Sequence, residues 1–113
     1  EISMSSETKV CEILDKENLK SYTISPKDFG YDFCDKKELE GGSVKENAEI
    51  IRNIFNLKDN GAKRKAVCMN AGAGFYIAKK VKNIKEGVQM AENLIDEKKA
   101  FEKLEDFIKE SNS

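Results

Sequence analysis

Histidine is absent from this 113-residue sequence, which is long enough for one modest domain and too short for two. Its absence excludes Ser-His and Cys-His nucleophile pairs, His-ligated zinc or iron centres, and an imidazole acting as general base near neutral pH. Any chemistry in this chain must therefore come from carboxylates, amines, hydroxyls, backbone amides or the three cysteines.

The cysteines, Cys11, Cys34 and Cys68, are few and widely spaced. No C-x-x-C pair is present, which excludes a zinc knuckle and a thioredoxin-type redox site. Unpaired thiols without an N-x-S/T glycosylation site are typical of a reducing compartment, so we expect a cytoplasmic location. We expect Cys11 and Cys68 to be small core residues, and the acidic neighbours of Cys34 to raise its pKa. None of the three is expected to be catalytic.

Long apolar runs and an excess of one charge are also missing. The chain carries 20 basic and 21 acidic residues, for a net charge of −1. No apolar run approaches the length of a transmembrane helix, and no secretory signal precedes the first residues. The near balance of charge argues against a generic nucleic-acid binder or a membrane-surface protein. We therefore expect neither nucleic acid nor a membrane as a partner.

The basic residues are nevertheless unevenly placed. A basic block at residues 63–85 holds seven bases and no acid: Lys63, Arg64, Lys65, Lys79, Lys80, Lys82 and Lys85. One hypothesis is a non-catalytic anion- or RNA-binding domain that uses this block. The other is that these bases solvate the two ends of one apolar helix. The second is favoured because aromatic residues with a spacing suited to base stacking are absent.

The residues that are present predict an α/β fold, with strands first and helices after. Thr8–Leu14 and Leu19–Ile24 are rich in β-forming residues and flank a polar turn, which predicts a hairpin. Four cap residues, each followed three positions later by an acidic residue, predict helix starts: Ser25, Asp35, Ser43 and Asn83. We expect one segment over residues 1–113, with strands within about 1–24 and about five helices within about 26–110.

Two of the predicted helices have distinct apolar patterns. The helix from Val44 to about Leu57 carries a stripe that we expect to face the core: Val44, Ala48, Ile51 and Phe55, widened by Ile50 and Ile54. Residues 66–78 are almost all apolar or small, which predicts a helix buried on most sides. The run 70–75 within it fails the dinucleotide-binding fingerprint, because Ile77 occupies the third glycine position. Its small residues predict close packing against another element.

Two stretches could bind ligands. Gly41-Gly42-Ser43 could hold an anion on free N–H groups, although a turn followed by a helix cap explains the same residues. Glu1 opens a polar stretch and could be a hard oxygen ligand for Mg²⁺, although a lone terminal Glu is more often only solvated. The chain opens on Glu1 without an initiator Met, so we expect a processed or truncated product. The residues alone reveal no complete active site.

Several motifs follow one another along nearly the whole chain. They are a strand and P-x-D-F-G run (22–30), a glycine pair and N-A helix start (39–48), a hydrophobic N-A helix (67–71) and an E-G-x-x-x-A helix (84–96). In this order they resemble the C-terminal portion of the anthranilate phosphoribosyltransferase family, glycosyltransferases with the nucleoside phosphorylase-type fold. Departures from the family pattern occur at Leu57, Lys65 and Lys98. The pyrimidine-nucleoside phosphorylases are a less good match and remain an alternative.

The resemblance implies a role for Glu1 and an activity for the intact enzyme. Glu1 matches the Glu of an Asp-Glu pair that binds Mg²⁺ at the diphosphate of phosphoribosyl diphosphate. The implied reaction transfers phosphoribose to anthranilate in tryptophan biosynthesis. The family's glycine-rich phosphate loop and anthranilate-contacting residues lie upstream, so no catalytic residue is expected here and the substrate-binding residues stay unknown. We expect the segment alone to be inactive and to self-associate, and the intact enzyme to be a homodimer.

Overall fold

The computed structural model of the chain describes residues 1–112, with side chains through residue 110. Two strands, β1 (Thr8–Ile13) and β2 (Leu19–Ile24), precede two single-turn 3-10 helices, η1 (Pro26–Phe29) and η2 (Lys36–Leu39). Four α-helices follow: α1 (Val44–Phe55), α2 (Ala62–Ile77), α3 (Ile84–Asp96) and α4 (Lys99–Asn112). This order confirms the predicted α/β class. The helix count differs slightly from the expected five, because the segments after Ser25 and Asp35 form only 3-10 turns.

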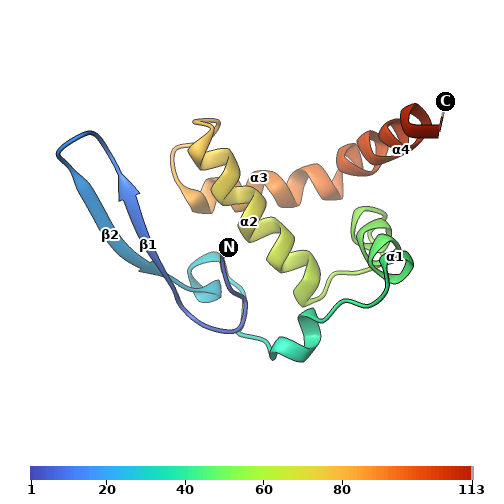
Figure 1. The fold of residues 1–113 in the computed structure, drawn as a ribbon, viewed down its shortest axis with the longest axis horizontal. Coiled ribbons are helices and arrows are strands. Elements are labelled where there is room, and N and C mark those ends of the chain that lie inside the picture. The colour runs from blue at the N-terminus through green and yellow to red at the C-terminus, as the bar shows by residue number, and fades with distance from the viewer. Residues whose placement is uncertain (113) are drawn as a thin grey trace.

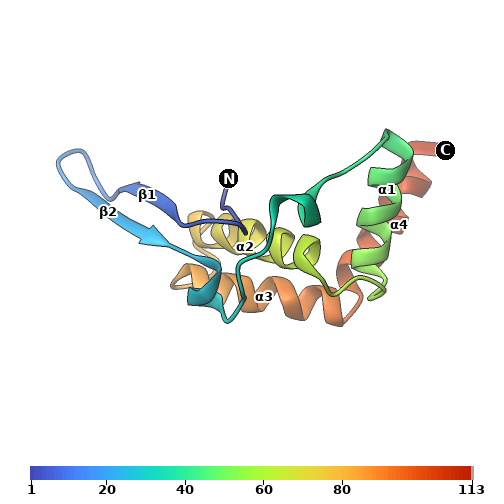
Figure 2. The same ribbon diagram turned by 90° about the horizontal axis from the view of Figure 1, so that it is seen from below.

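The predicted hairpin is present and projects from the helices (Figures 1 and 2). Its strands pair antiparallel, with Thr8 opposite Ile24. Asp15 Oδ1 accepts the N–H groups of Glu17 at 2.9 Å and Asn18 at 3.0 Å, which closes the turn. The prediction that Cys11 is a core residue is wrong, because β1 lies in the projecting hairpin and leaves Cys11 exposed.

Helices α2 and α3 form the most extensive contact between helices. A Cβ atom on Gly87 would overlap the carbonyl oxygen of Gly72, and a Cβ on Gly72 would overlap the backbone of Val88. The two backbones therefore approach closely where neither residue has a side chain, which confirms the predicted use of small residues in α2. Helices α1 and α4 lie at the opposite end from the hairpin (Figures 1 and 2). Within residues 1–112, none of the helices combines the length and hydropathy needed to cross a bilayer.

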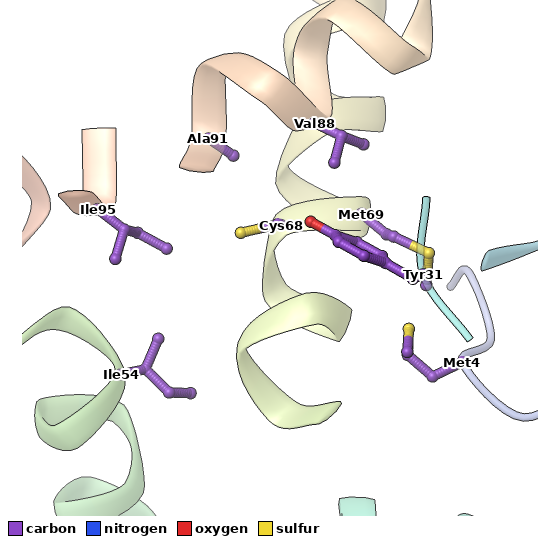
Figure 3. Close-up of a cluster of buried hydrophobic side chains, with 8 residues drawn as sticks. All are labelled: Met4, Tyr31, Ile54, Cys68, Met69, Val88, Ala91 and Ile95. Atoms are coloured by element: carbon purple, nitrogen blue, oxygen red, sulfur yellow. The ribbon is translucent and has the colours of Figure 1, made fainter. Parts of the chain in front are cut away.

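A cluster of eight buried side chains forms the core (Figure 3): Met4, Tyr31, Ile54, Cys68, Met69, Val88, Ala91 and Ile95. The burial of Cys68 confirms its prediction as a core residue. The predicted stripe on α1 is wrong in part, since Val44 is 88% exposed and Ile51 is 45% exposed. Only the C-terminal half of α1 reaches the core, through Ile54. Helix α2 is buried at its middle rather than on most sides, because Ile77 is 78% exposed.

Candidate functional site

Glu1 lies at a cavity between the first residues of the chain and two helices. This space, the Glu1 cavity, has a volume of about 470 Å³ and is lined by residues 1–4, Leu39, Gly41, α1 and the first half of α2. Among the described residues that line it, Glu1 is the only carboxylate and Lys63 the only cation. Most of the remaining wall is apolar. The arrangement can therefore present one negative and one positive group to a ligand beside an apolar surface.

The segment that carries Glu1 is held by Asn70 of α2. Asn70 Oδ1 accepts the N–H of Ile2 at 2.8 Å, and Asn70 Nδ2 donates to the carbonyl of Ile2 at 3.2 Å. Asn70 Nδ2 also donates to the carbonyl of Ala66, one turn earlier on α2, at 2.9 Å. One side-chain amide therefore binds both backbone groups of the residue next to Glu1. Sequence reasoning placed Asn70 only within a helical motif, and a polar side chain inside an apolar helix was the available signal.

Two further anchors hold residues 3 and 4. Ser3 N–H donates to Thr8 Oγ1 at 3.0 Å, which ties the segment to the first residue of β1. Met4 is 1% exposed and packs in the core cluster near Met69 and Tyr31 (Figure 3). Its carbonyl accepts the N–H of Cys34 at 3.1 Å. Glu1 therefore extends from an anchored backbone, although its own side chain is exposed.

In the glycine pair before α1, the N–H of Gly42 is occupied by a side chain rather than free for an anion. Gly42 N–H donates to Asn47 Oδ1 at 2.8 Å, and Asn47 Nδ2 returns a bond to the Gly42 carbonyl at 3.2 Å. Ser43 Oγ accepts the N–H of Glu46 at 3.2 Å, as a helix cap does. A Cβ on Gly41 would overlap the side chain of Asn47. These contacts favour the interpretation of the stretch as a turn followed by a cap.

The donor set at Glu1 fits a shared Mg²⁺ site. Within the described residues, no three His, Cys, Asp or Glu side chains form a group that could hold a metal by themselves. Protein sites for Mg²⁺ commonly use one or two carboxylates and complete the octahedron with substrate phosphates and water. The Glu1 carboxylate at the cavity is a suitable single ligand of that kind.

The basic block is not one solvated surface. Arg64 is 8% exposed, and its guanidinium forms an ion pair with Asp96 of α3 at 2.9 Å. Burial lowers the pKa of Arg64, but the hydrogen bond and charge of Asp96, together with Cys68 and Glu92, raise it on balance, so Arg64 stays charged. Lys65 Nζ lies 5.7 Å from the centre of the Tyr31 ring, and Lys63 lines the Glu1 cavity. The prediction that all seven bases solvate helix ends is therefore wrong for Arg64.

The thiols at positions 34 and 68 have raised pKa values. Burial raises the pKa of Cys68 to about 11, and the nearby Glu92 carboxylate adds to the effect. The Tyr31 hydroxyl donates a hydrogen bond to the Glu92 carboxylate. Burial is the main cause that raises the pKa of Tyr31, and this hydrogen bond is the second. The pKa of Cys34 is raised by burial first and then by Glu38 and Asp35, as its acidic neighbours predicted. A neutral thiol is a poor nucleophile.

A second cavity, the hairpin cavity, lies between the hairpin and α2 and has a volume of about 620 Å³. Glu12 of β1 and Tyr76 of α2 both line this cavity. The Glu12 carboxylate accepts a hydrogen bond from the Tyr76 hydroxyl at 2.6 Å. The same carboxylate accepts the hydroxyl of Tyr22 of β2 at 3.1 Å. The bond to Tyr76 attaches the hairpin to α2, and the bond to Tyr22 joins the two strands.

Comparison with known proteins identifies the class of protein to which this fold and site belong. Residues 1–101 match the family described as "Glycosyl transferase family, a/b domain", and the chain belongs to that family. Two curated relatives are anthranilate phosphoribosyltransferases. The one from Methanobrevibacter smithii is 46% identical and the one from Acetivibrio thermocellus is 40% identical, each over 100% of this chain.

A solved structure of the same kind shares the fold. The anthranilate phosphoribosyltransferase from Thermus thermophilus superimposes with a TM-score of 0.86 at 30% sequence identity, covering 96% of this chain. The chain accounts for 31% of that structure and for 33% and 32% of the two curated relatives. It therefore spans about a third of the length of the proteins it matches.

Proposed function

We propose that this chain is the C-terminal segment of a longer anthranilate phosphoribosyltransferase of tryptophan biosynthesis. The observation that supports the proposal is 46% identity to a protein of that name over the whole chain. In the reaction, the bond between the anomeric carbon of phosphoribosyl diphosphate and its diphosphate breaks. A bond forms from that carbon to the amino nitrogen of anthranilate, diphosphate leaves and the amine loses a proton.

The contribution of this chain is the Glu1 carboxylate and the wall behind it. Glu1 would hold Mg²⁺, which neutralises charge on the departing diphosphate when it is bound. Apolar residues of α1 and α2 line one side of the cavity. Electrostatic interactions are stronger beside such a surface than in bulk water. Lys63 adds a positive charge to the same cavity, where it can attract an anionic substrate.

The location, oligomeric state, metal and substrates of the longer protein follow from the same function. We place the longer protein in the cytoplasm as a homodimer that uses Mg²⁺ and the small molecules phosphoribosyl diphosphate and anthranilate. The segment alone is inactive in this account, because a single carboxylate and a cavity wall do not hold and orient two substrates.

The test compares two substrate pairs on the longer protein that contains this chain. With Mg²⁺, phosphoribosyl diphosphate and anthranilate, mass spectrometry should detect phosphoribosyl anthranilate and diphosphate in equal amounts. Phosphate with a pyrimidine nucleoside should give no free base. Phosphorolysis of the nucleoside without turnover of anthranilate would instead assign the protein to the nucleoside phosphorylases. Turnover of anthranilate by the 113-residue chain alone would contradict the inactive segment.

A further inference from the structure

We propose that Asn70 is a positioning residue for the metal ligand Glu1, and this inference rests on the function proposed above. The two residues come from distant parts of the chain, the first residue and the middle of α2. Asn70 does not line the Glu1 cavity, so it acts on Glu1 through the backbone rather than by contact with a ligand.

The hydrogen bonds of Asn70 control the orientation of the peptide group that follows Glu1. The N–H of Ile2 belongs to the planar peptide unit that joins Glu1 to Ile2, and Asn70 Oδ1 accepts it at 2.8 Å. Because that unit is planar, its orientation determines where the Glu1 Cα lies. Only rotation about the Cα–C bond of Glu1 then remains to set the direction in which its side chain leaves the backbone. Asn70 Nδ2 also donates to the Ile2 carbonyl at 3.2 Å. This second hydrogen bond keeps the segment from turning about the first hydrogen bond, the one to the N–H of Ile2.

Only a side-chain amide supplies this pair of bonds in so small a volume. It offers an acceptor and a donor side by side, as a neighbouring strand would to Ile2. The third bond, to the carbonyl of Ala66 at 2.9 Å, determines which way the amide faces, because that carbonyl requires the NH₂ group. Aspartate has the same size but lacks the donor, so it would place a carboxylate against the carbonyls of Ile2 and Ala66.

Thr8 is a second, weaker anchor of the same segment. Its hydroxyl accepts the N–H of Ser3 at 3.0 Å, one residue further from Glu1. Residues that orient a metal ligand from behind typically change metal affinity by about 10- to 100-fold when they are replaced. We expect Asn70→Asp to fall in that range, and Thr8→Val to shift affinity in the same direction by a smaller factor.

The experiment measures Mn²⁺ binding to the longer protein in the presence of phosphoribosyl diphosphate, by the electron paramagnetic resonance signal of free Mn²⁺. Asn70→Asp and Thr8→Val are compared with Tyr76→Phe as the matched control. Tyr76 is on the same helix, and its hydroxyl bonds Glu12 of β1 rather than the backbone of residues 1–4. Thermal unfolding of each variant reports the loss of stability. Activity is measured against Mg²⁺ concentration in parallel.

Asn70→Asp should bind Mn²⁺ more weakly, by roughly 10- to 100-fold, and raised Mg²⁺ should recover its activity. Tyr76→Phe should lose stability without a change in Mn²⁺ affinity. Wild-type Mn²⁺ affinity in Asn70→Asp would overturn the inference, as would an equal shift in Tyr76→Phe. If Asn70→Asp does not fold, an unchanged affinity in Thr8→Val also overturns it. A wild-type protein that neither binds Mn²⁺ with phosphoribosyl diphosphate nor turns over anthranilate contradicts the proposed function instead.

Discussion

At the scale of the residue, Gly72 and Gly87 determine how closely α2 and α3 approach. A glycine in a helix interior costs about 0.5–1 kcal/mol relative to alanine, so it needs a compensating contact. Here the compensation is backbone contact between the two helices, which a Cβ on either residue would prevent. Gly74, also in α2, has no atom within 4 Å of the place where its Cβ would be, apart from its own neighbours and helix backbone.

Gly87→Ala is therefore expected to lower the free energy of unfolding by about 1–3 kcal/mol, because the added methyl group forces the helices apart. Gly74→Ala is the matched control and should raise it by up to about 1 kcal/mol. Urea unfolding followed by circular dichroism measures both. Equal effects of the two substitutions would show that the close approach of α2 and α3 is not what the structure describes.

Cys68 is expected to make stability depend on alkaline pH. Its pKa is about 11 in the folded chain, compared with an ordinary value of 9.0. Between these values the folded state keeps a proton that the unfolded state has lost, so the free energy of unfolding falls as pH rises from about 9 to about 11. A pKa difference of about two units corresponds to about 2–3 kcal/mol of lost folding stability once the pH exceeds both values. Urea unfolding at several pH values gives the free energy of unfolding as a function of pH. Between about pH 9 and 11 it should fall less steeply in Cys68→Ala than in the wild type. The same slope in both would contradict a raised pKa of Cys68.

Residue chemistry was predictable where it depends on neighbours in the sequence. The direction of the Cys34 pKa shift was expected from its acidic neighbours, although burial is the largest cause and Glu38 and Asp35 add to it. Arg64 was assigned to solvent because its partner Asp96 lies 32 positions away on another helix. The role of Asn70 was missed for the same reason, since Ile2 lies 68 positions away. Pairs of this kind depend on how the elements pack, which local sequence does not contain.

At the scale of the element, side-chain caps define where α1 and α3 begin. Ser43 Oγ accepts the N–H of Glu46 at 3.2 Å, and Asn83 Oδ1 accepts the N–H of Glu86 at 2.8 Å. Each bond satisfies one of the backbone donors that a helix leaves free at its start. Helix α2 begins at Ala62, and the glycine at its N-cap, Gly61, supplies no such bond.

Replacing a cap should cost about 1 kcal/mol in the free energy of unfolding. Asn83→Ala removes the acceptor for Glu86 and is expected to show this loss in thermal or urea unfolding. Asn83→Asp keeps an acceptor of the same size and should lose much less. No difference between the two variants would mean that α3 does not depend on its cap.

Element boundaries were predictable from caps and turns, whereas buried faces were less so. The starts of α1 and α3 lie where Ser43 and Asn83 predicted them. The apolar stripe of α1 was assigned to the core as a whole, but only Ile54 is buried there. Helical periodicity shows that one face is apolar and does not show which part of it another element covers.

At the scale of the whole molecule, the chain is extended and exposes apolar surface on the hairpin. Its radius of gyration is 15.5 Å, compared with about 13 Å for a compact domain of this length. On the hairpin, Ile13 is 75% exposed and Leu19 is 68% exposed, and Ile77 at the end of α2 is 78% exposed. A two-stranded hairpin is marginally stable by itself, and its open edges can pair with another chain.

The isolated 113-residue chain is therefore expected to self-associate through the hairpin. Sedimentation velocity at increasing concentration should show a rising weight-average sedimentation coefficient. Leu19→Lys should reduce the association, whereas Val44→Lys, on α1 at the opposite end, should change it little. A wild-type chain that stays monomeric at every concentration would contradict the prediction.

In the function proposed above, this chain supplies Glu1 to a phosphoribosyltransferase as a ligand for Mg²⁺. Loss of anthranilate fluorescence, recorded for the longer protein with phosphoribosyl diphosphate across a series of Mg²⁺ concentrations, tests it most directly. The wild-type protein should consume anthranilate only when Mg²⁺ is present, and Glu1→Gln should need more Mg²⁺ or lose the activity. Anthranilate consumption without Mg²⁺, or a Glu1→Gln variant with the wild-type Mg²⁺ dependence, would contradict the account.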